Sequence, residues 1–331
     1  MIYYIKLNQM KAYIFIPDTD KKAGFGHLKR SINLSLYVPK KDKVFIFIKN
    51  SFPKTILNKM KRKDIKFLIY KKLNEKLFLS LKKKYELIAI VDSYNKKLHN
   101  LTFKNIFLKK ISIIDFKIKN NSQINIDHTF GRKKNFHTIK KNQKIFLGHN
   151  FFPMRPIKKN KEIKNIILIN FGTFKNKIIF EKSLFFLRQL NLKKSLKIFL
   201  INQYLKKNDL KKYNKLINNK IIHFKYINNL DDIYKKTLFS IGACGISLYE
   251  RSFFHIPSIA KSVAKNQNYN FSNFSQKKCI LKFDKIINKK KINHKNRIKL
   301  LQMIAKTKIR LEKVFNHNNN NRNLKKLFRK L

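Results

Sequence analysis

Gly24, Gly26, His27 and Arg30 form a Gly-x-Gly-His-x-x-Arg pattern between a short apolar run and an amphipathic stretch. This order predicts a strand, a glycine loop and a helix. The first N–H groups and the positive dipole end of such a helix favour a bound phosphate, and His27 would lie where that anion binds. The spacing is neither the Gly-x-Gly-x-x-Gly of dinucleotide folds nor a P-loop, so those two mechanisms are excluded.

A second glycine loop follows the apolar residues 238–241. Gly242 and Gly245 precede another helical stretch, which predicts a second phosphate site. Glu250 falls near the first turn of that helix. A carboxylate is poorly suited to bind phosphate and well suited to bind the vicinal hydroxyls of a ribose. The alternative is a charge that is simply favourable at a helix N-terminus.

Glycine is scarce in this chain, with 7 glycines among 331 residues. The chain is rich in Lys, Asn, Ile and Phe, as if these had replaced other residues wherever they could. The glycines that remain are therefore expected at positions where the backbone conformation, or the close approach of another group, leaves no room for a side chain. Gly172 ends the first expected strand of the second half and predicts one more turn at a binding edge. Six of the seven glycines lie in candidate site segments, namely Gly24, Gly26, Gly148, Gly172, Gly242 and Gly245.

Short apolar runs alternate with amphipathic stretches in the first half of the chain, which predicts βαβ units and a mostly parallel sheet. The expected strands cover residues 12–16, 44–48, 66–70, 87–91 and 111–114, and the expected helices lie near 28–37, 53–61 and 73–84. Asp92 and Asp115 follow expected strands. Because the carboxyl ends of parallel strands face the ligand crevice, both are candidate site residues. For each, a turn or helix-cap role is the alternative.

The same rhythm restarts after a polar, proline-containing bridge near residues 153–163. Its expected strands cover residues 166–171, 197–201, 221–225, 238–241 and 257–260, and its expected helices cover 180–189, 212–217 and 248–253. We therefore predict an α/β protein with two Rossmann-like domains that face a cleft, over residues 10–155 and 163–331. A Lys/Asn-rich tail from about residue 285 would include a helix at 299–314 and a flexible linker at 316–323.

The net charge is +61, from 78 basic and 17 acidic residues. Such a charge favours nucleic acid or an anionic membrane as a partner. The lysines, however, are spread through almost every segment, and the sequence has no zinc-finger spacing, RNA-recognition motif or arginine-rich arm. General lysine enrichment of solvated faces is the favoured interpretation, and a basic nucleic-acid-binding protein is the alternative of another class.

The cysteines and the apolar segments indicate the compartment. Cys244 and Cys279 are far apart and give neither a metal-ligand spacing nor a disulfide framework. The chain lacks a signal-peptide pattern and any apolar run near the ~20 residues of a membrane span. We expect a cytoplasmic protein without a membrane span, starting at Met1 or at Met10. The sequence gives no indication of an oligomeric state.

Together these motifs resemble the PseG family, the UDP-sugar hydrolases of pseudaminic acid biosynthesis, which are related to the MurG-type glycosyltransferases of GT-B fold. The resemblance spans about residues 12–270. The two glycine loops are typical of the wider MurG-like group, and Tyr94 after Asp92 and the Leu147-Gly148…Arg155 segment favour the hydrolase within it. The residues that carry it include Gly24, Gly26, His27, Arg30, Asp92, Tyr94, Gly148, Arg155, Gly172, Gly242, Gly245, Glu250, Arg251, Pro257, Asn266 and Gln267.

The resemblance implies hydrolysis of UDP-2,4-diacetamido-2,4,6-trideoxy-β-L-altrose to UDP and the free sugar, without a metal or another cofactor. His27 would position or deprotonate the attacking water, or, in the alternative, bind phosphate only. Tyr94 and Asn266 would hold the sugar or the water. The implied substrate-binding residues are Asp18, Gly24, Gly26, Arg30, Asp92, Arg155, Gly172, Gly245, Ile246, Ser247, Glu250 and Gln267.

Within that set, backbone N–H groups at Gly245, Ile246 and Ser247 would take the diphosphate, and Glu250 would hold the ribose. Two positions depart from the family pattern. Ile16 replaces a usual arginine, and Lys175 stands where an acid is expected. A GT-B glycosyltransferase that hands the sugar of a UDP-sugar to an acceptor is the alternative enzyme, although the sequence shows no distinct acceptor surface.

Overall fold

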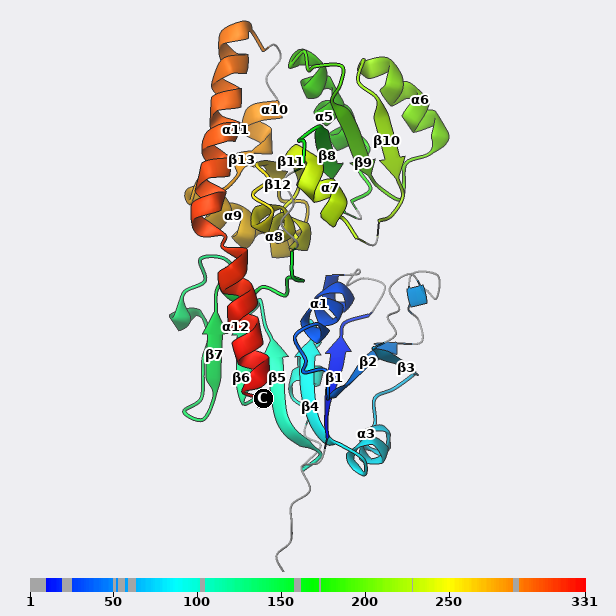
Figure 1. Ribbon diagram of the computed structural model, residues 1–331, viewed down its shortest axis with the longest axis vertical. Coiled ribbons are helices and arrows are strands. Elements are labelled where there is room, and N and C mark those ends of the chain that lie inside the picture. Colours follow the sequence, from blue (N-terminus) through cyan, green and yellow to red (C-terminus); the bar gives the residue numbers. More distant parts are fainter. Residues whose placement is uncertain are drawn as a thin grey trace, which may run out of the picture. The chain divides into compact units, whose positions relative to one another are not determined.

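The computed structural model describes residues 10–19, 26–49, 52, 57–58, 64–101, 105–157, 162–172, 174–227, 229–287 and 292–331. The chain divides into two compact units (Figure 1). Unit 1 contains Met1–Pro156 and Asn318–Leu331, and unit 2 contains Ile157–His317. Gly24 and most of the helix expected near residues 53–61 lie outside the described residues.

Unit 1 is built on a seven-stranded parallel sheet in the order β3-β2-β1-β4-β5-β6-β7. The strands are β1 (Lys11–Pro17), β2 (Lys43–Lys49), β3 (Lys66–Tyr70), β4 (Glu86–Asp92), β5 (Phe107–Ile113), β6 (Ile124–Asp127) and β7 (Lys144–Leu147). The helices include α1 (Gly26–Ser35), α3 (Glu75–Lys82) and α4 (Lys96–His99), with the short turns η1 (Lys134–Phe136) and η2 (His149–Phe151). The order 3-2-1-4 around the first strand is that of a Rossmann-like sheet.

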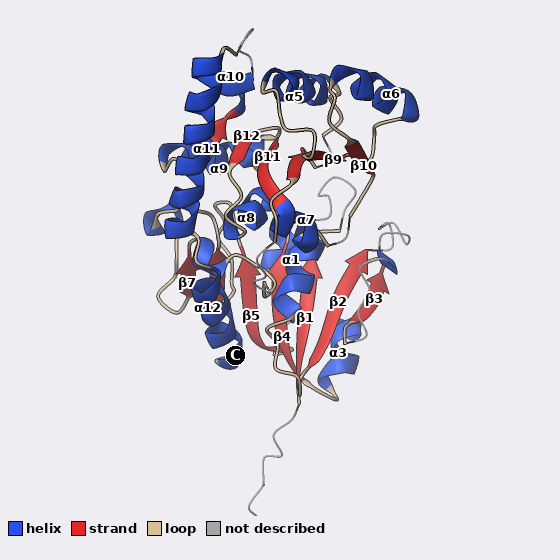
Figure 2. Ribbon diagram, turned by 45° about the horizontal axis from the view of Figure 1, so that its top comes forward, coloured by secondary structure: helices blue, strands red, loops and turns tan. Residues whose placement is uncertain are grey.

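The sheet of unit 1 is buried on both faces, which explains its continuous apolar strands. Tyr13 and Phe15 of β1 pack in one cluster with Leu28 of α1. Their neighbour Ile14 points the other way, into a cluster with Phe78 of α3. Helices therefore cover both faces of the sheet (Figure 2).

Unit 2 repeats this plan with a six-stranded parallel sheet in the order β10-β9-β8-β11-β12-β13. Its strands are β8 (Ile166–Asn170), β9 (Lys197–Ile201), β10 (Ile221–Phe224), β11 (Thr237–Ala243), β12 (Ser258–Lys261) and β13 (Leu281–Lys282). Its helices are α5 (Ile178–Gln189), α6 (Lys207–Leu216), α7 (Asp231–Lys236), α8 (Ile246–Phe253), α9 (Asn268–Gln276), α10 (Phe283–Ile287) and α11 (His294–Val314), with the turn η3 (Lys265–Gln267).

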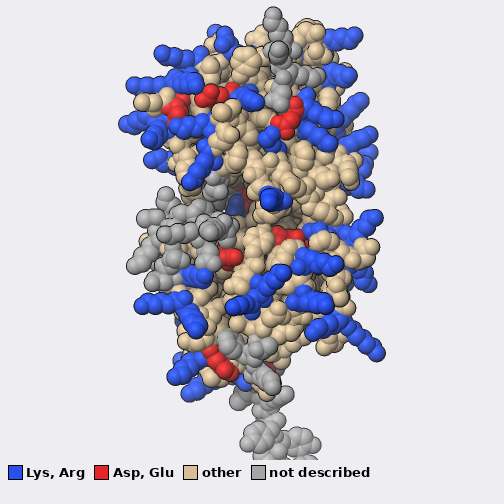
Figure 3. Space-filling view, turned by 180° about the vertical axis from the view of Figure 1, so that it is seen from behind, with Lys and Arg blue, Asp and Glu red and all other residues tan. Residues whose placement is uncertain are grey.

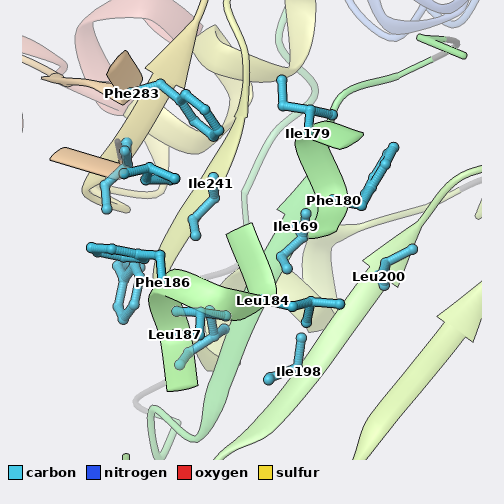
Figure 4. Close-up of a cluster of buried hydrophobic side chains, with 14 of the residues drawn as sticks. Ile169, Ile179, Phe180, Leu184, Phe186, Leu187, Ile198, Leu200, Ile241 and Phe283 are labelled. Carbon is cyan, nitrogen blue, oxygen red and sulfur yellow. The ribbon is translucent and has the colours of Figure 1, made fainter. Parts of the chain in front are cut away.

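The core of unit 2 lies between its sheet and the helices beside it. Figure 4 shows Leu184 and Leu187 of α5 among Ile169, Ile198 and Leu200 of the adjacent strands β8 and β9. These five side chains are completely buried. The spacing of Leu184 and Leu187 places both on one face of α5, so the helix is held against the sheet by apolar burial.

The C-terminal segment corrects the sequence prediction. Residues 316–323 were expected to form a flexible linker, but α12 (His317–Arg329) runs through them, and Asn318–Leu331 belong to unit 1 rather than to the second domain. Leu324, Leu327 and Phe328 of α12 are buried in the core that also contains Tyr13. Their helical spacing gives the asparagine-rich segment an apolar face, and that face is what folds it.

Lys and Arg side chains are spread over both units on the face drawn in Figure 3 rather than gathered on one element. This distribution agrees with general lysine enrichment of exposed faces. Among the helices that the structure describes, none is long and apolar enough to cross a membrane.

Candidate active site

The carboxyl edge of the unit 1 sheet carries a row of aspartates. Asp92 is the last residue of β4, and Asp127 is the last residue of β6. Asp18 follows β1, and Asp115 follows β5. Because the strands are parallel, their carboxyl ends lie at the same edge, where open α/β sheets bind ligands. The expectation that Asp92 and Asp115 lie at this edge is confirmed.

A buried histidine–aspartate pair lies at the centre of this edge. His27 is the second residue of α1, and its Nδ1 atom lies 2.7 Å from Oδ1 of Asp92. Both side chains are almost fully buried. Nη2 of Arg30 lies 2.7 Å from the same Nδ1 atom and can only donate, whereas the Asp92 carboxylate can only accept. We assign the proton to Nδ1, which then donates to Asp92, because this carboxylate is negatively charged and the Nη2 group of Arg30 already donates to its Oδ1 atom. The Nε2 atom of His27 is then the ring nitrogen that can take up a proton.

Arg30, one turn further along α1, binds the same carboxylate with two nitrogens. Its Nε atom donates to Oδ2 of Asp92 over 2.8 Å, and its Nη2 atom donates to Oδ1 over 2.6 Å. Burial raises the pKa of Asp92, but Arg30 and His27 outweigh burial and hold that pKa at about 2. Asp92 is therefore ionised at neutral pH.

The position of Arg30 differs from the one expected of a residue that binds substrate. Its side chain is only 3% exposed. Its Nη1 atom lies 3.6 Å from Oδ2 of Asp115 and 3.3 Å from Nε2 of His128. Burial and the nearby Arg30 lower the pKa of His128 to about 4, so this ring is neutral and can accept from the guanidinium. Arg30 thus holds the cluster together from inside.

Tyr94 lies directly against His27. The two rings meet edge to face with their centroids 4.7 Å apart. The hydroxyl of Tyr94 donates to Oδ2 of Asp115 over 3.3 Å. Asp18 supports the turn that carries Tyr94, because its Oδ2 atom accepts from the Ser93 hydroxyl and from the Tyr94 N–H. With 39% of its surface exposed, Tyr94 reaches solvent, and Asp115 is partly exposed beside it.

Helix α1 and Tyr37, which follows it, fix the segment before Arg155. Asn33 donates its amide to the carbonyl of Pro153 over 2.9 Å, and the Tyr37 hydroxyl donates to the carbonyl of Met154 over 2.6 Å. Arg155 follows this anchored stretch and is partly exposed. Gly26 is the first residue of α1, so the helix N-terminus lies beside His27 as the sequence predicted.

In unit 2 the second glycine loop leads from β11 into α8. Gly245 is the N-cap residue of α8, and Ile246 and Ser247 are its first two residues. The N–H groups of a first helical turn have no partner within their own helix. Gln267 closes the loop, since its Oε1 atom accepts from the N–H groups of Cys244 and Val263. Gln267 therefore shapes the backbone of the loop where the sequence predicted a contact to substrate.

The remaining predicted residues of unit 2 lie near this loop or at other strand ends. Glu250 is only 2% exposed, and its Oε2 atom accepts from the Tyr234 hydroxyl over 3.0 Å. Gly172 forms a turn after β8 with a φ of 65° and donates its N–H to the Asn170 side chain. Asn266 is exposed within η3.

The structure brings Asp18, His27, Arg30, Asp92 and Tyr94 into one cluster, and it places Gly245, Ile246 and Ser247 at one helix end. Sequence reasoning missed a second buried group, in which Asp127 accepts from His137 over 2.7 Å and from Arg132 over 2.9 Å. The available signal was weak, because Ile124-Asn125-Ile126-Asp127 is an alternating run of only four residues that ends in an aspartate.

No protein-family model and no curated protein matches the chain. Solved structures match it over most of its length. A glycosyltransferase of kitacinnamycin has a TM-score of 0.64 and 11% identity, with 97% of this chain and 99% of that chain covered. MurG of Acinetobacter baumannii has a TM-score of 0.60 and 12% identity, with 97% and 100% covered. UGT2 of Phytolacca americana, solved with UDP-2-fluoro-glucose and pterostilbene, has a TM-score of 0.62 and 8% identity, with 92% and 94% covered.

At these identities the likeness shows the fold. The chain has two Rossmann-like α/β domains with parallel sheets, the GT-B fold, and this confirms the predicted fold class. MurG, to whose fold group the sequence motifs were compared, is among the solved structures that share this fold.

Proposed function

We propose that this protein is a nucleotide-sugar hydrolase that cleaves a UDP-linked diacetamido-trideoxy sugar into UDP and the free sugar, as in pseudaminic acid biosynthesis. The observation that carries the proposal is the buried pair of His27 and Asp92, with 2.7 Å between Nδ1 and Oδ1. This contact orients the imidazole and leaves Nε2 to act as a general base.

In the proposed reaction, Nε2 of His27 takes a proton from a water molecule as the water oxygen forms a bond to the anomeric carbon. The bond between that carbon and the phosphate oxygen breaks, and its electron pair leaves with UDP. Asp92 stabilises the imidazolium that forms, because it is ionised and hydrogen-bonded to Nδ1. His27 then releases the proton to solvent.

Arg30 has a supporting role in this proposal. By donating twice to Asp92, it fixes the carboxylate that orients His27. Tyr94 packs against the imidazole and reaches solvent, so its ring would limit the rotation of His27 and contact the sugar. Asn266 and Arg155 remain proposed contacts to the sugar and to the phosphates, in keeping with their partly or fully exposed side chains.

The second glycine loop would bind the leaving group. The backbone N–H groups of Gly245, Ile246 and Ser247 at the start of α8 suit the growing negative charge on the diphosphate. Glu250 would take the ribose hydroxyls by exchanging its hydrogen bond with Tyr234 for one with the sugar. Complexes of similar structures support a UDP ligand, since one was solved with UDP-2-fluoro-glucose and another, LpCGTa, with UDP.

A second candidate function is transfer of the sugar to an acceptor. The similar structures that favour it include the glycosyltransferase of kitacinnamycin. The same His27–Asp92 pair would then deprotonate an acceptor hydroxyl instead of water. The resemblance of Tyr94 after Asp92 and of the Leu147-Gly148…Arg155 segment to the PseG family favours the hydrolase.

The test is release of UDP from a panel of UDP-2-acetamido sugars without an acceptor, with His27→Asn beside the wild type. The matched control is His294→Asn, because His294 is exposed at the start of α11. We expect UDP release that His27→Asn abolishes and His294→Asn leaves unchanged, with UDP still bound by both variants. Binding of UDP with no turnover of any UDP-sugar would favour the transferase. Absence of UDP binding would contradict both the hydrolase and the transferase.

A further inference from the structure

A buried arginine lies beneath the second glycine loop. Arg251 is 0% exposed, and its guanidinium donates to the carbonyl of Ala243 over 2.8 Å, to Oγ of Ser258 over 3.1 Å and to Oγ of Ser247 over 3.2 Å. All three acceptors are neutral. Within the described part of the chain, no carboxylate lies within salt-bridge distance of Arg251. The neighbouring carboxylate, that of Glu250, accepts a hydrogen bond from the Tyr234 hydroxyl.

The charge of Arg251 is therefore not neutralised by direct contact. A buried ion without an ionic partner is unfavourable, and burial accordingly lowers the pKa of Arg251. An anion that binds close to the guanidinium would supply the missing counter-charge. The attraction would be stronger than at an exposed lysine, because the effective dielectric constant inside a protein is low.

Arg251 also determines what Ser247 can do. The Oγ atom of Ser247 accepts from Nη1 of Arg251, which leaves the hydroxyl hydrogen of Ser247 to donate elsewhere. Ser247 lies in the first turn of α8. Its hydroxyl can therefore add to the backbone N–H groups of that turn as a donor to a phosphate oxygen.

The packing that admits this arginine explains one of the scarce glycines. A Cβ atom on Gly242 would lie 2.2 Å from the carbonyl oxygen of Asn170 and 3.2 Å from Nη1 of Arg251. Gly242 lies inside β11 rather than in the loop. It lets β11 approach β8 closely while the guanidinium fills the space beside it.

We infer that Arg251 is a positioning residue that makes this loop selective for a diphosphate. Its buried charge attracts the anion, and its hydrogen bond turns Ser247 into a phosphate donor. The inference rests on the proposed UDP site and adds to it the residue responsible for recognising the phosphates. The uracil and ribose parts of the ligand should be bound independently of Arg251.

The experiment compares the affinities of UDP and uridine for the wild type and for Arg251→Met, Arg251→Lys and Ser247→Ala. Arg188→Met is the matched control, because Arg188 is exposed on α5 of the same unit. We expect Arg251→Met to weaken the affinity for UDP by roughly 10- to 100-fold, because it removes the buried positive charge and the hydrogen bond that orients Ser247. The affinity for uridine should stay within about twofold. The affinity of Arg251→Lys for UDP should lie between those of the wild type and Arg251→Met, because lysine keeps the positive charge.

Ser247→Ala keeps the test decisive if Arg251→Met folds poorly. It should weaken the affinity for UDP by about three- to tenfold, the value of one hydrogen bond, and leave the affinity for uridine unchanged. If Arg251 were merely structural, its substitution would weaken the affinities for UDP and for uridine by the same factor. That result, or an unchanged affinity for UDP, would overturn this inference and leave the proposed function standing. A wild type that binds neither UDP nor uridine overturns the proposed function as well.

Discussion

His27 and Asp92 are 65 residues apart in the chain and meet through a 2.7 Å contact between Nδ1 and Oδ1. One comes from the start of α1 and the other from the last position of β4. Strand β1 pairs with β4 along its whole length, so the helix that follows β1 begins beside the end of β4. The pairing of two central strands thus creates the pair of side chains on which the proposed chemistry depends.

Replacing Asp92 by asparagine should therefore remove catalysis without removing binding. An amide cannot stabilise the imidazolium as a carboxylate does, and it can favour the wrong tautomer of His27. We expect kcat to fall by about 10²- to 10⁴-fold, the usual contribution of an oriented general base. The affinity for UDP, which unit 2 would bind, should change little.

The control for Asp92→Asn is Asp232→Asn, because the Asp232 side chain is 82% exposed on α7. Circular dichroism and the melting temperature would show whether Asp92→Asn is folded, since the substitution also removes the carboxylate that accepts two hydrogen bonds from the buried Arg30. A folded Asp92→Asn variant with wild-type kcat would contradict the proposed role of the pair.

His128 should make the protein sensitive to mild acid. Its folded pKa of about 4 lies below the ordinary 6.5, so between these values the unfolded chain binds a proton that the folded protein does not. Stability must then fall as the pH drops from 6.5 towards 4. We expect the protonation of His128 to lower the free energy of unfolding by on the order of 1–3 kcal/mol over that pH range.

The measurement for His128 is the melting temperature of the wild type and of His128→Gln between pH 4 and 7. Glutamine has an amide oxygen that can still accept from Arg30 and does not titrate in this range. The two curves should separate as the pH falls, with the variant losing less stability. Parallel curves would mean that His128 is not buried as a neutral ring.

Much of the fold was predictable because apolar runs mark buried parallel strands directly. The strands expected at residues 66–70 and 197–201 match β3 and β9 in both bounds. The sequence analysis did not predict β6 and β7, which have only four residues each. A run that short carries too little periodicity to be separated from a loop.

The site was predictable where side chains follow strands, as Asp92 and Asp115 do. It was not predictable where a role depends on partners from elsewhere in the chain. Arg30 was expected to bind substrate, and only the structure shows its guanidinium enclosed by Asp92, Asp115 and His128. The buried charge of Arg251 likewise depends on contacts from three separate segments.

The C-terminal helix should contribute strongly to the stability of unit 1. Phe328 is 2% exposed, and its ring packs against Tyr13 and Tyr37. Phe328→Ala should cost about 3–5 kcal/mol in the free energy of unfolding, since it leaves a cavity in the core. Lys325→Ala on the exposed face of α12 is the control. Equal denaturation midpoints for both variants would support the flexible linker that the asparagine-rich sequence first indicated.

Gly242 and Gly245 should respond differently to the same substitution. A Cβ atom on Gly242 would lie 2.2 Å from the backbone of Asn170, whereas one on Gly245 would meet only the end of the Gln267 side chain at 3.4 Å. Gly242→Ala must force β11 away from β8, so we expect the free energy of unfolding to fall by about 1–3 kcal/mol. Gly245 has a φ of −83°, which alanine adopts freely.

Gly245→Ala should therefore fold as well as the wild type, and any change in its affinity for UDP would report on the loop itself. Chemical denaturation of the two variants measures the difference, and the slope of each transition shows whether unfolding remains cooperative. If Gly242→Ala were as stable as Gly245→Ala, the close approach of β11 to β8 would be wrong. The packing that holds Arg251 beneath the loop would then have to be reconsidered, because the same strand forms one wall of its site.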